Sequence, residues 1–208
     1  MFSDARSERR AEIAALAAQL IADGGLDYQS AKRKAARQLF GDGLAARQMP
    51  DNDEIDRSLL EYLQLFDPDH AARVERYRAA ALLWMERLAA FRPYLTGAAW
   101  KGIVAPHAPL HLQVFTDDAK ELEMLLLDAG VAYDVAEVAH FGGRADVPAL
   151  TFYDREDLPV MISIYRFDDL RGALKRSGGG SGGTERGGVE ALRRLLGAAP
   201  EAAGPPAR

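Results

Sequence analysis

The sequence predicts an α+β fold, in which an N-terminal helical region precedes a small mixed β-sheet with packed helices. Apolar residues of the first half recur at three- and four-residue spacing, which is typical of amphipathic helices. Strand-like apolar runs dominate the second half. From Arg176 the composition changes to glycine and serine in the stretch SGGGSGGTERGG, which is typical of a flexible linker. We therefore expect three parts, at residues 1–66, 67–176 and 177–208.

The first part carries three helices. The first has an apolar stripe that ends at the double glycine Gly24-Gly25, and the second covers residues 28–40. After a loop, Asp51 and Glu54 form an acidic variant of the capping box and begin a third amphipathic helix.

A long fourth helix opens the second part. Asp67-Pro68 predicts its N-cap and first turn, and Pro93 is expected to stop it. Its apolar stripe, which we assign to core packing, consists of Val74, Tyr77, Ala81, Trp84, Leu88 and Phe91.

Strands and one helix complete the second part. The helix KELEMLLLDAG ends at Gly130, as a helix with a C′ glycine does. FGGRADVP is expected to join two antiparallel strands, and DREDLP to form a tight polar turn. The predicted strands are 109–115, 131–138, 147–153 and 158–165. The third part adds the short helix VEALRRLLG and a tail, EAAGPPAR, that we expect to be disordered.

Composition narrows the possible functions. The chain has 208 residues, a net charge of −5 and no cysteine. The charge argues against coating nucleic acid, and the missing thiols exclude disulfides and cysteine nucleophiles. Asp4, Glu8 and Glu12 break the basic character that a signal peptide needs, and no apolar run reaches the length of a membrane span. We expect a cytoplasmic protein that does not contact the membrane.

Residues 96–118, TGAAWKGIVAPHAPLHLQVFTDD, place two glycines before an apolar strand and two aspartates. In metal-assisted nucleotidyl transfer, carboxylates at i and i+2 of one strand and a third on a neighbouring strand hold two divalent ions. Residues 95–115 resemble the nucleotidyltransferase superfamily, the fold shared by DNA polymerase β and MNT-type enzymes. That signature is G-S, a second glycine five residues after the first, and S-D-h-D-h with h apolar. Gly97 and Gly102 match the glycines.

The resemblance covers about residues 90 to 170 and implies the superfamily's fold, but the metal-binding acids are missing. Ala98 stands at the serine, and Pro109 and His111 stand at the first two acid positions. The third acid would fall near Met161 or Ser163, and neither is a carboxylate. Neutral groups do not offset the cost of dehydrating Mg²⁺. We therefore interpret the chain as a catalytically degenerate binding or regulatory module and expect no cofactor.

Two alternatives remain open. The chain could be an active Mg²⁺-dependent nucleotidyltransferase with displaced acids, for which Asp117, Asp118 and Asp168 are candidates. Asp117 is otherwise expected to be the N-cap of the following helix. The second alternative is a nucleic-acid-associated regulator with a possible weak nucleic-acid contact through the acid-free helix at 28–40, whose basic residues are Lys32, Arg33, Lys34 and Arg37.

The candidate ligand is an unknown small molecule or nucleotide. No residue is a confident catalytic candidate, and neither a metal site nor an oligomeric state is predicted. His107 precedes the strand and could join His111 on a metal, and His140 is expected to be exposed at a strand end. The candidate ligand-binding residues are Gly97, Ala98, Lys101, Gly102, His111 and Gln113.

Overall fold

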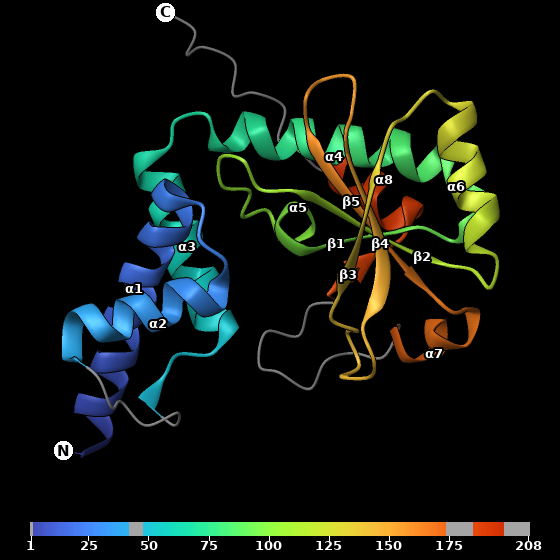
Figure 1. Cartoon of the computed structure of the whole chain (residues 1–208). Coiled ribbons are helices and arrows are strands. Elements are labelled where there is room, and N and C mark those ends of the chain that lie inside the picture. The colour runs from blue at the N-terminus through green and yellow to red at the C-terminus, as the bar shows by residue number, and fades with distance from the viewer. Residues whose placement is uncertain (1, 42–47, 174–184, 198–208) are drawn as a thin grey trace, which may run out of the picture.

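The computed structural model describes residues 2–41, 48–173 and 185–197, and its architecture is α+β as predicted (Figure 1). The helices are α1 (Phe2–Gly24), α2 (Tyr28–Phe40), α3 (Asn52–Phe66), α4 (His70–Arg87), α5 (Gly97–Lys101), α6 (Ala119–Asp128), α7 (Leu170–Ala173) and α8 (Val189–Gly197). The strands are β1 (Tyr94–Thr96), β2 (Leu110–Phe115), β3 (Asp134–Val138), β4 (Val147–Tyr153), β5 (Pro159–Tyr165) and β6 (Arg186–Gly187).

The strands form one mixed sheet in the order β3-β4-β5-β2-β1-β6. β2 and β5 are parallel, and the other neighbours are antiparallel. The two predicted antiparallel connections, at 141–148 and 154–159, join β3 to β4 and β4 to β5 as expected. The predicted helix at 189–197 is also present. Residues 177–184 of the predicted linker SGGGSGGTERGG and the tail after 197 lie outside the described residues. The end of that linker prediction was wrong, because Arg186 and Gly187 are buried and form β6 beside β1.

The helices α1, α2 and α3 pack around an apolar core of their own, and they lie to one side of the sheet in Figure 1. Its largest buried members are Ile13, Ile55, Leu59 and Leu63. Two residues of the segment between α5 and β2, Ile103 and Ala105, are buried in the same core. The helical region therefore packs onto the α/β part, and the division at residues 66 and 67 stays a prediction.

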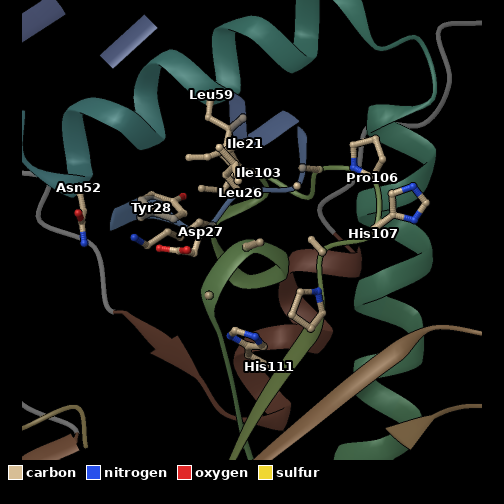
Figure 2. A pocket seen from close by; sticks show the side chains of 17 residues that line it. Ile21, Leu26, Asp27, Tyr28, Asn52, Leu59, Ile103, Pro106, His107 and His111 are labelled. Carbon is tan, nitrogen blue, oxygen red and sulfur yellow. The ribbon is translucent and has the colours of Figure 1, made fainter. Parts of the chain in front are cut away.

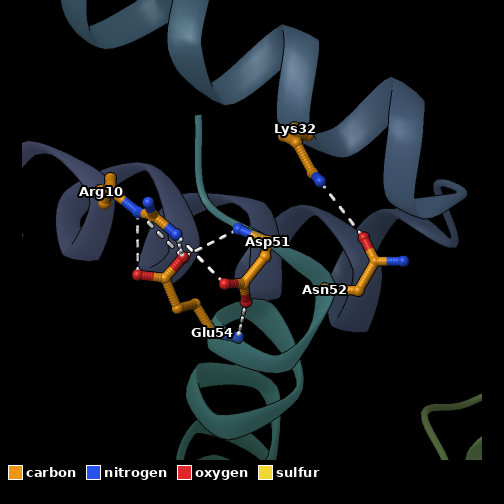
Figure 3. Close-up of polar contacts among 5 residues, drawn as sticks. All are labelled: Arg10, Lys32, Asp51, Asn52 and Glu54. Carbon is orange, nitrogen blue, oxygen red and sulfur yellow. Dashed lines mark hydrogen bonds and ion pairs between the residues drawn. The ribbon is translucent and has the colours of Figure 1, made fainter. Parts of the chain in front are cut away.

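The predicted capping box at the start of α3 is confirmed (Figure 3). The Asp51 side chain accepts from the Glu54 backbone N–H at 2.9 Å, and the Glu54 side chain accepts from the Asp51 N–H at 2.8 Å. Arg10 of α1 pairs with both carboxylates, and Lys32 of α2 donates to the Asn52 side chain at 3.2 Å. Polar side-chain contacts at the N-terminus of α3 thus connect the three helices.

The start and end of α4 differ from the prediction. The helix begins at His70, and the Asp67 side chain accepts from the Asp69 N–H at 3.2 Å instead of capping the first turn. Arg73 also binds the Asp67 carboxylate, so that carboxylate serves the turn before the helix. The helix ends at Arg87, and a 3-10 turn over Ala89–Phe91 carries the last stripe residue before Pro93.

The sheet has two faces of different character. The face with α4, α6 and α8 is the main core, which includes Leu110, Leu112, Val114, Leu150, Val160 and Ile162. The opposite face carries the intervening residues of the same strands. There the register pairs His111 with Met161 and Gln113 with Ser163 across β2 and β5. His111, at the second acid position, therefore lies beside Met161, one of the two candidates for the third.

Two predictions about individual residues were wrong. The N-cap of α6 is Asp118 and not Asp117, since the Asp118 side chain accepts from the Glu121 N–H at 3.2 Å. His140 is buried and not exposed, because it packs against the Phe141 and Tyr165 rings and lies 3.4 Å from the Asp169 carboxylate.

None of the helices in the described ranges has both the length and the hydrophobicity that crossing a lipid bilayer requires.

Candidate functional site

The helices α1, α2 and α3 form a helical layer, and a cavity of about 470 Å³ lies between this layer and the start of β2. Gly97, Ala98, Lys101 and His111 line it, so the structure brings four of the six predicted ligand-binding residues to one place. Figure 2 shows His111 at its base, with apolar side chains of the helical layer opposite. The apolar lining includes Ile21, Leu26, Leu59 and Ile103. The sequence did not predict this apolar wall of the cavity, because α1–α3 lie far from β2 along the chain.

Gly97 allows the backbone to turn sharply from β1 into α5. Its φ of +66° lies in the left-handed region, and a Cβ built on it would come within 3.3 Å of the His111 Nδ1. Both the backbone conformation and the close approach therefore favour glycine. The stretch that the sequence indicates as a glycine turn is in fact this turn followed by a five-residue helix.

Two arginines of α4 donate hydrogen bonds to backbone carbonyls of α5 and of the segment that follows it. Arg78 donates to the carbonyl oxygens of Ala99 at 3.0 Å and Trp100 at 3.2 Å, and Arg73 donates to that of Val104 at 3.0 Å. These bonds satisfy carbonyls that a short helix leaves without partners. Gly102 ends α5 with a φ of +73° and lies against Arg78, and it does not line the cavity.

His111 is the polar group at the base of the cavity. Its Nε2 atom is buried and has no hydrogen-bond partner among the described residues. Burial lowers the pKa of His111 below its ordinary value, because desolvation disfavours the charged imidazolium. The imidazole is therefore neutral at pH 7 and adds no positive charge to the cavity.

A chain of polar contacts joins the helical layer to α5 beside the cavity. The Tyr28 hydroxyl of α2 donates to the Asp56 carboxylate of α3 at 2.5 Å, and the Lys101 ammonium binds the other oxygen of that carboxylate. Burial, with the Asp56 contact, raises the pKa of Tyr28 well above its ordinary value. Lys101, one of the predicted ligand-binding residues, is thus already paired.

Gln113 lies on the same strand face as His111 but outside the cavity. It is buried, and its side-chain oxygen accepts from the Arg186 guanidinium of β6 at 2.5 Å. Arg186 also lies over the Phe141 ring, 4.5 Å from its centroid, and burial lowers the pKa of its guanidinium. This buried cation was not foreseen, because Arg186 follows the glycine-rich stretch in sequence.

The displaced acids lie at the other end of β2. Asp117 is six residues beyond His111, about 20 Å along an extended strand. It accepts from the Phe167 N–H at 3.3 Å, while Asp118 caps α6 and Asp168 is exposed in the 3-10 turn after β5. None of the three lines the cavity. Within the described ranges, no group of three or more His, Asp or Glu side chains has an arrangement that could hold a metal ion.

The four basic residues of α2 do not line the cavity, although Tyr28 at the start of the helix does. Arg33, Lys34 and Arg37 are exposed on α2, and Lys32 is half-buried above the start of α3. The structure therefore brings three of the four predicted nucleic-acid contacts to the surface. Contact with nucleic acid stays a prediction, for which the expected result is salt-sensitive binding that weakens when Lys32, Arg33 and Lys34 are replaced.

We expect the stability of the protein to fall as the pH decreases from 7.5 to 5.5. The folded-state pKa of His111 lies below its ordinary 6.5, so the unfolded chain binds the proton first. Burial also lowers the pKa of His70 below its ordinary value. Urea unfolding at both pH values measures the loss, and His111→Gln should show a smaller loss than the wild type. Equal losses in both proteins would show that His111 is not held neutral by burial.

The comparison with solved structures finds distant likeness in the fold. No protein-family model matches the sequence, and no curated protein matches it. A solved structure described as the structural basis for the activity of a cytoplasmic RNA terminal U-transferase is similar over 54% of this chain, at 18% identity and a TM-score of 0.35. The part of this chain that matches spans 35% of that protein's length. At these values the likeness indicates no shared activity or substrate.

Proposed function

We propose that this chain is a nucleotidyltransferase-like binding or regulatory module that binds a small ligand in the cavity at His111 and does not transfer nucleotides. One observation carries the proposal: the cavity opens at the glycine turn and at the second acid position of the resemblance, and that position holds a neutral histidine. A binding site is thus retained where the metal chemistry is lost.

The order of elements supports the resemblance independently of the glycine spacing. β1, α5, β2 and α6 follow one another, and β5 runs parallel beside β2. His111 and Met161 are register partners on these two strands, and residues paired in this way point to the same face of a sheet. The second and third acids of a two-metal site would stand on such a pair.

The residues at these positions argue against catalysis. Mg²⁺ keeps near-octahedral oxygen coordination and dehydrates reluctantly, so carboxylates are needed to hold it. Proline, histidine, methionine and serine occupy positions 109, 111, 161 and 163. The active-enzyme alternative would need Asp117 or Asp118 to reach the cavity, and their contacts at the far end of β2 speak against it.

Nuclear magnetic resonance with a fragment library tests the binding half of the proposal. We expect bound fragments to shift the backbone amides of Gly97, Lys101 and His111 in the absence of Mg²⁺. Ala98→Leu adds volume to the lining and should weaken these shifts. Ala119→Leu is the matched control, since Ala119 is a half-buried alanine in the first turn of α6 and lies outside the cavity.

Fragments that shift only amides elsewhere, or whose shifts survive Ala98→Leu unchanged, would contradict a ligand site in this cavity.

A further inference from the structure

The charged groups at the cavity are either paired with an opposite charge or negative. Among the described residues, Lys101 is the one lysine of the lining and no arginine lines it. The Lys101 ammonium is bound to the Asp56 carboxylate. Asp27 stands at the rim, and hydrogen bonds from the Ser30 side chain and backbone lower the pKa of its carboxyl. Asp27 is therefore ionised at neutral pH. Carboxylates outnumber ammonium groups around this space.

This balance disfavours an anionic ligand. A like charge brought against an ionised carboxylate costs affinity, and a triphosphate needs metal ions or several free cations to offset its charge. The cavity supplies neither from its described residues. His111 does not help, because burial keeps its imidazole uncharged.

The walls favour an apolar ring. Ile21, Leu59 and Ile103 are buried in the helical core and turn part of their surface to the cavity, and Leu26 and Pro106 extend this wall. In Figure 2 these side chains stand opposite His111, so a ring between them would meet aliphatic groups above and an imidazole below. Pockets of this size with mostly apolar walls and a few polar groups are typical of small-molecule sites.

We propose that the ligand of this cavity is an uncharged, mostly apolar ring compound. The apolar walls and the paired Lys101 ammonium carry this ligand class. This inference rests on the proposed function, because it gives the ligand class of the same cavity.

Two compounds with the same ring test the ligand class. Isothermal titration calorimetry at pH 7.5 compares 1-naphthol, which is neutral, with 1-naphthyl phosphate, which is an anion. We expect 1-naphthol to bind at least about tenfold more tightly. Ala98→Leu fills part of the cavity and should weaken 1-naphthol about fivefold. Ala119→Leu should leave both affinities unchanged.

The outcomes separate this inference from the proposed function. Equal or tighter binding of 1-naphthyl phosphate overturns the uncharged class and leaves the cavity as a ligand site. Binding of 1-naphthol that Ala98→Leu does not change would place the compound outside this cavity and overturns the inference. If neither compound binds, the inference fails, and the fragment experiment still decides separately whether the cavity binds ligands.

Discussion

Gly187→Ala is expected to lower the free energy of unfolding by about 3 kcal/mol, the upper end of the usual cost of adding a methyl group to a packed core. A Cβ at this position would lie 2.1 Å from the Trp100 Cζ3 and 2.2 Å from its Cη2. The indole packs against the main core and cannot move aside as the end of a flexible side chain would. The methyl group must therefore displace either Trp100 or β6.

Displacing β6 would affect the sheet face next to the cavity. Gly187 pairs with Leu95 of β1, and the neighbouring Arg186 pairs with Thr96 and reaches Gln113. Loss of β6 would leave the buried Gln113 side chain without this partner, which adds to the cost.

Chemical denaturation followed by tryptophan fluorescence measures the effect, since Trp84 and Trp100 are the two tryptophans of the chain. Gly188→Ala is the matched control, because its added Cβ would meet only the Tyr94 ring at 3.6 Å, an ordinary contact. A stability loss shared equally by the two variants would contradict the packing of Trp100 on β6.

Asp56→Ala is expected to cost about 2 kcal/mol, mainly because the Tyr28 hydroxyl then loses its acceptor in a largely buried position. The Lys101 contact adds little, since the ammonium end is more than a third exposed. Glu61→Ala, which removes an exposed acid of the same helix, is the control and should change stability by less than about 0.5 kcal/mol.

Asp56→Asn gives a second readout with less effect on folding. The amide oxygen still accepts from Tyr28, but the Lys101 charge is no longer neutralised. We therefore expect the preference for 1-naphthol over 1-naphthyl phosphate to shrink in this variant. Two results together would contradict this role: an unchanged preference in Asp56→Asn, and an Asp56→Ala variant as stable as the wild type. They would show that the Asp56 carboxylate neither stabilises the contact with Tyr28 nor sets the charge of the cavity.

Local signals predicted much of the fold. The second helix was predicted residue for residue, and the Asp51–Glu54 capping box was confirmed, because both depend on neighbouring residues. β4 was also predicted with its observed bounds, since a turn signal marks each end. Prediction was poorest for β1 and β6, which are three and two residues long and exist only through pairing with β2 and with each other.

The candidate site was predictable on one side only. Gly97, Ala98, Lys101 and His111 lie close in sequence, so the glycine spacing was enough to group them. The wall formed by Ile21, Leu26 and Leu59 depends on how the helical layer packs onto the rest, and no local pattern reports that. The same reason explains Arg186, whose burial follows from tertiary pairing rather than from its glycine-rich surroundings.

The most direct test of the account measures nucleotide binding and transfer with and without Mg²⁺. Thermal unfolding of the full chain with ATP, GTP, CTP and UTP should show no Mg²⁺-dependent shift, and radiolabelled nucleotides should not be transferred to protein or RNA. This follows from the neutral residues at positions 109, 111, 161 and 163. A clear Mg²⁺-dependent shift that Asp117→Ala with Asp118→Ala abolishes would show instead that displaced acids hold the metal, and would contradict a binding module without catalysis.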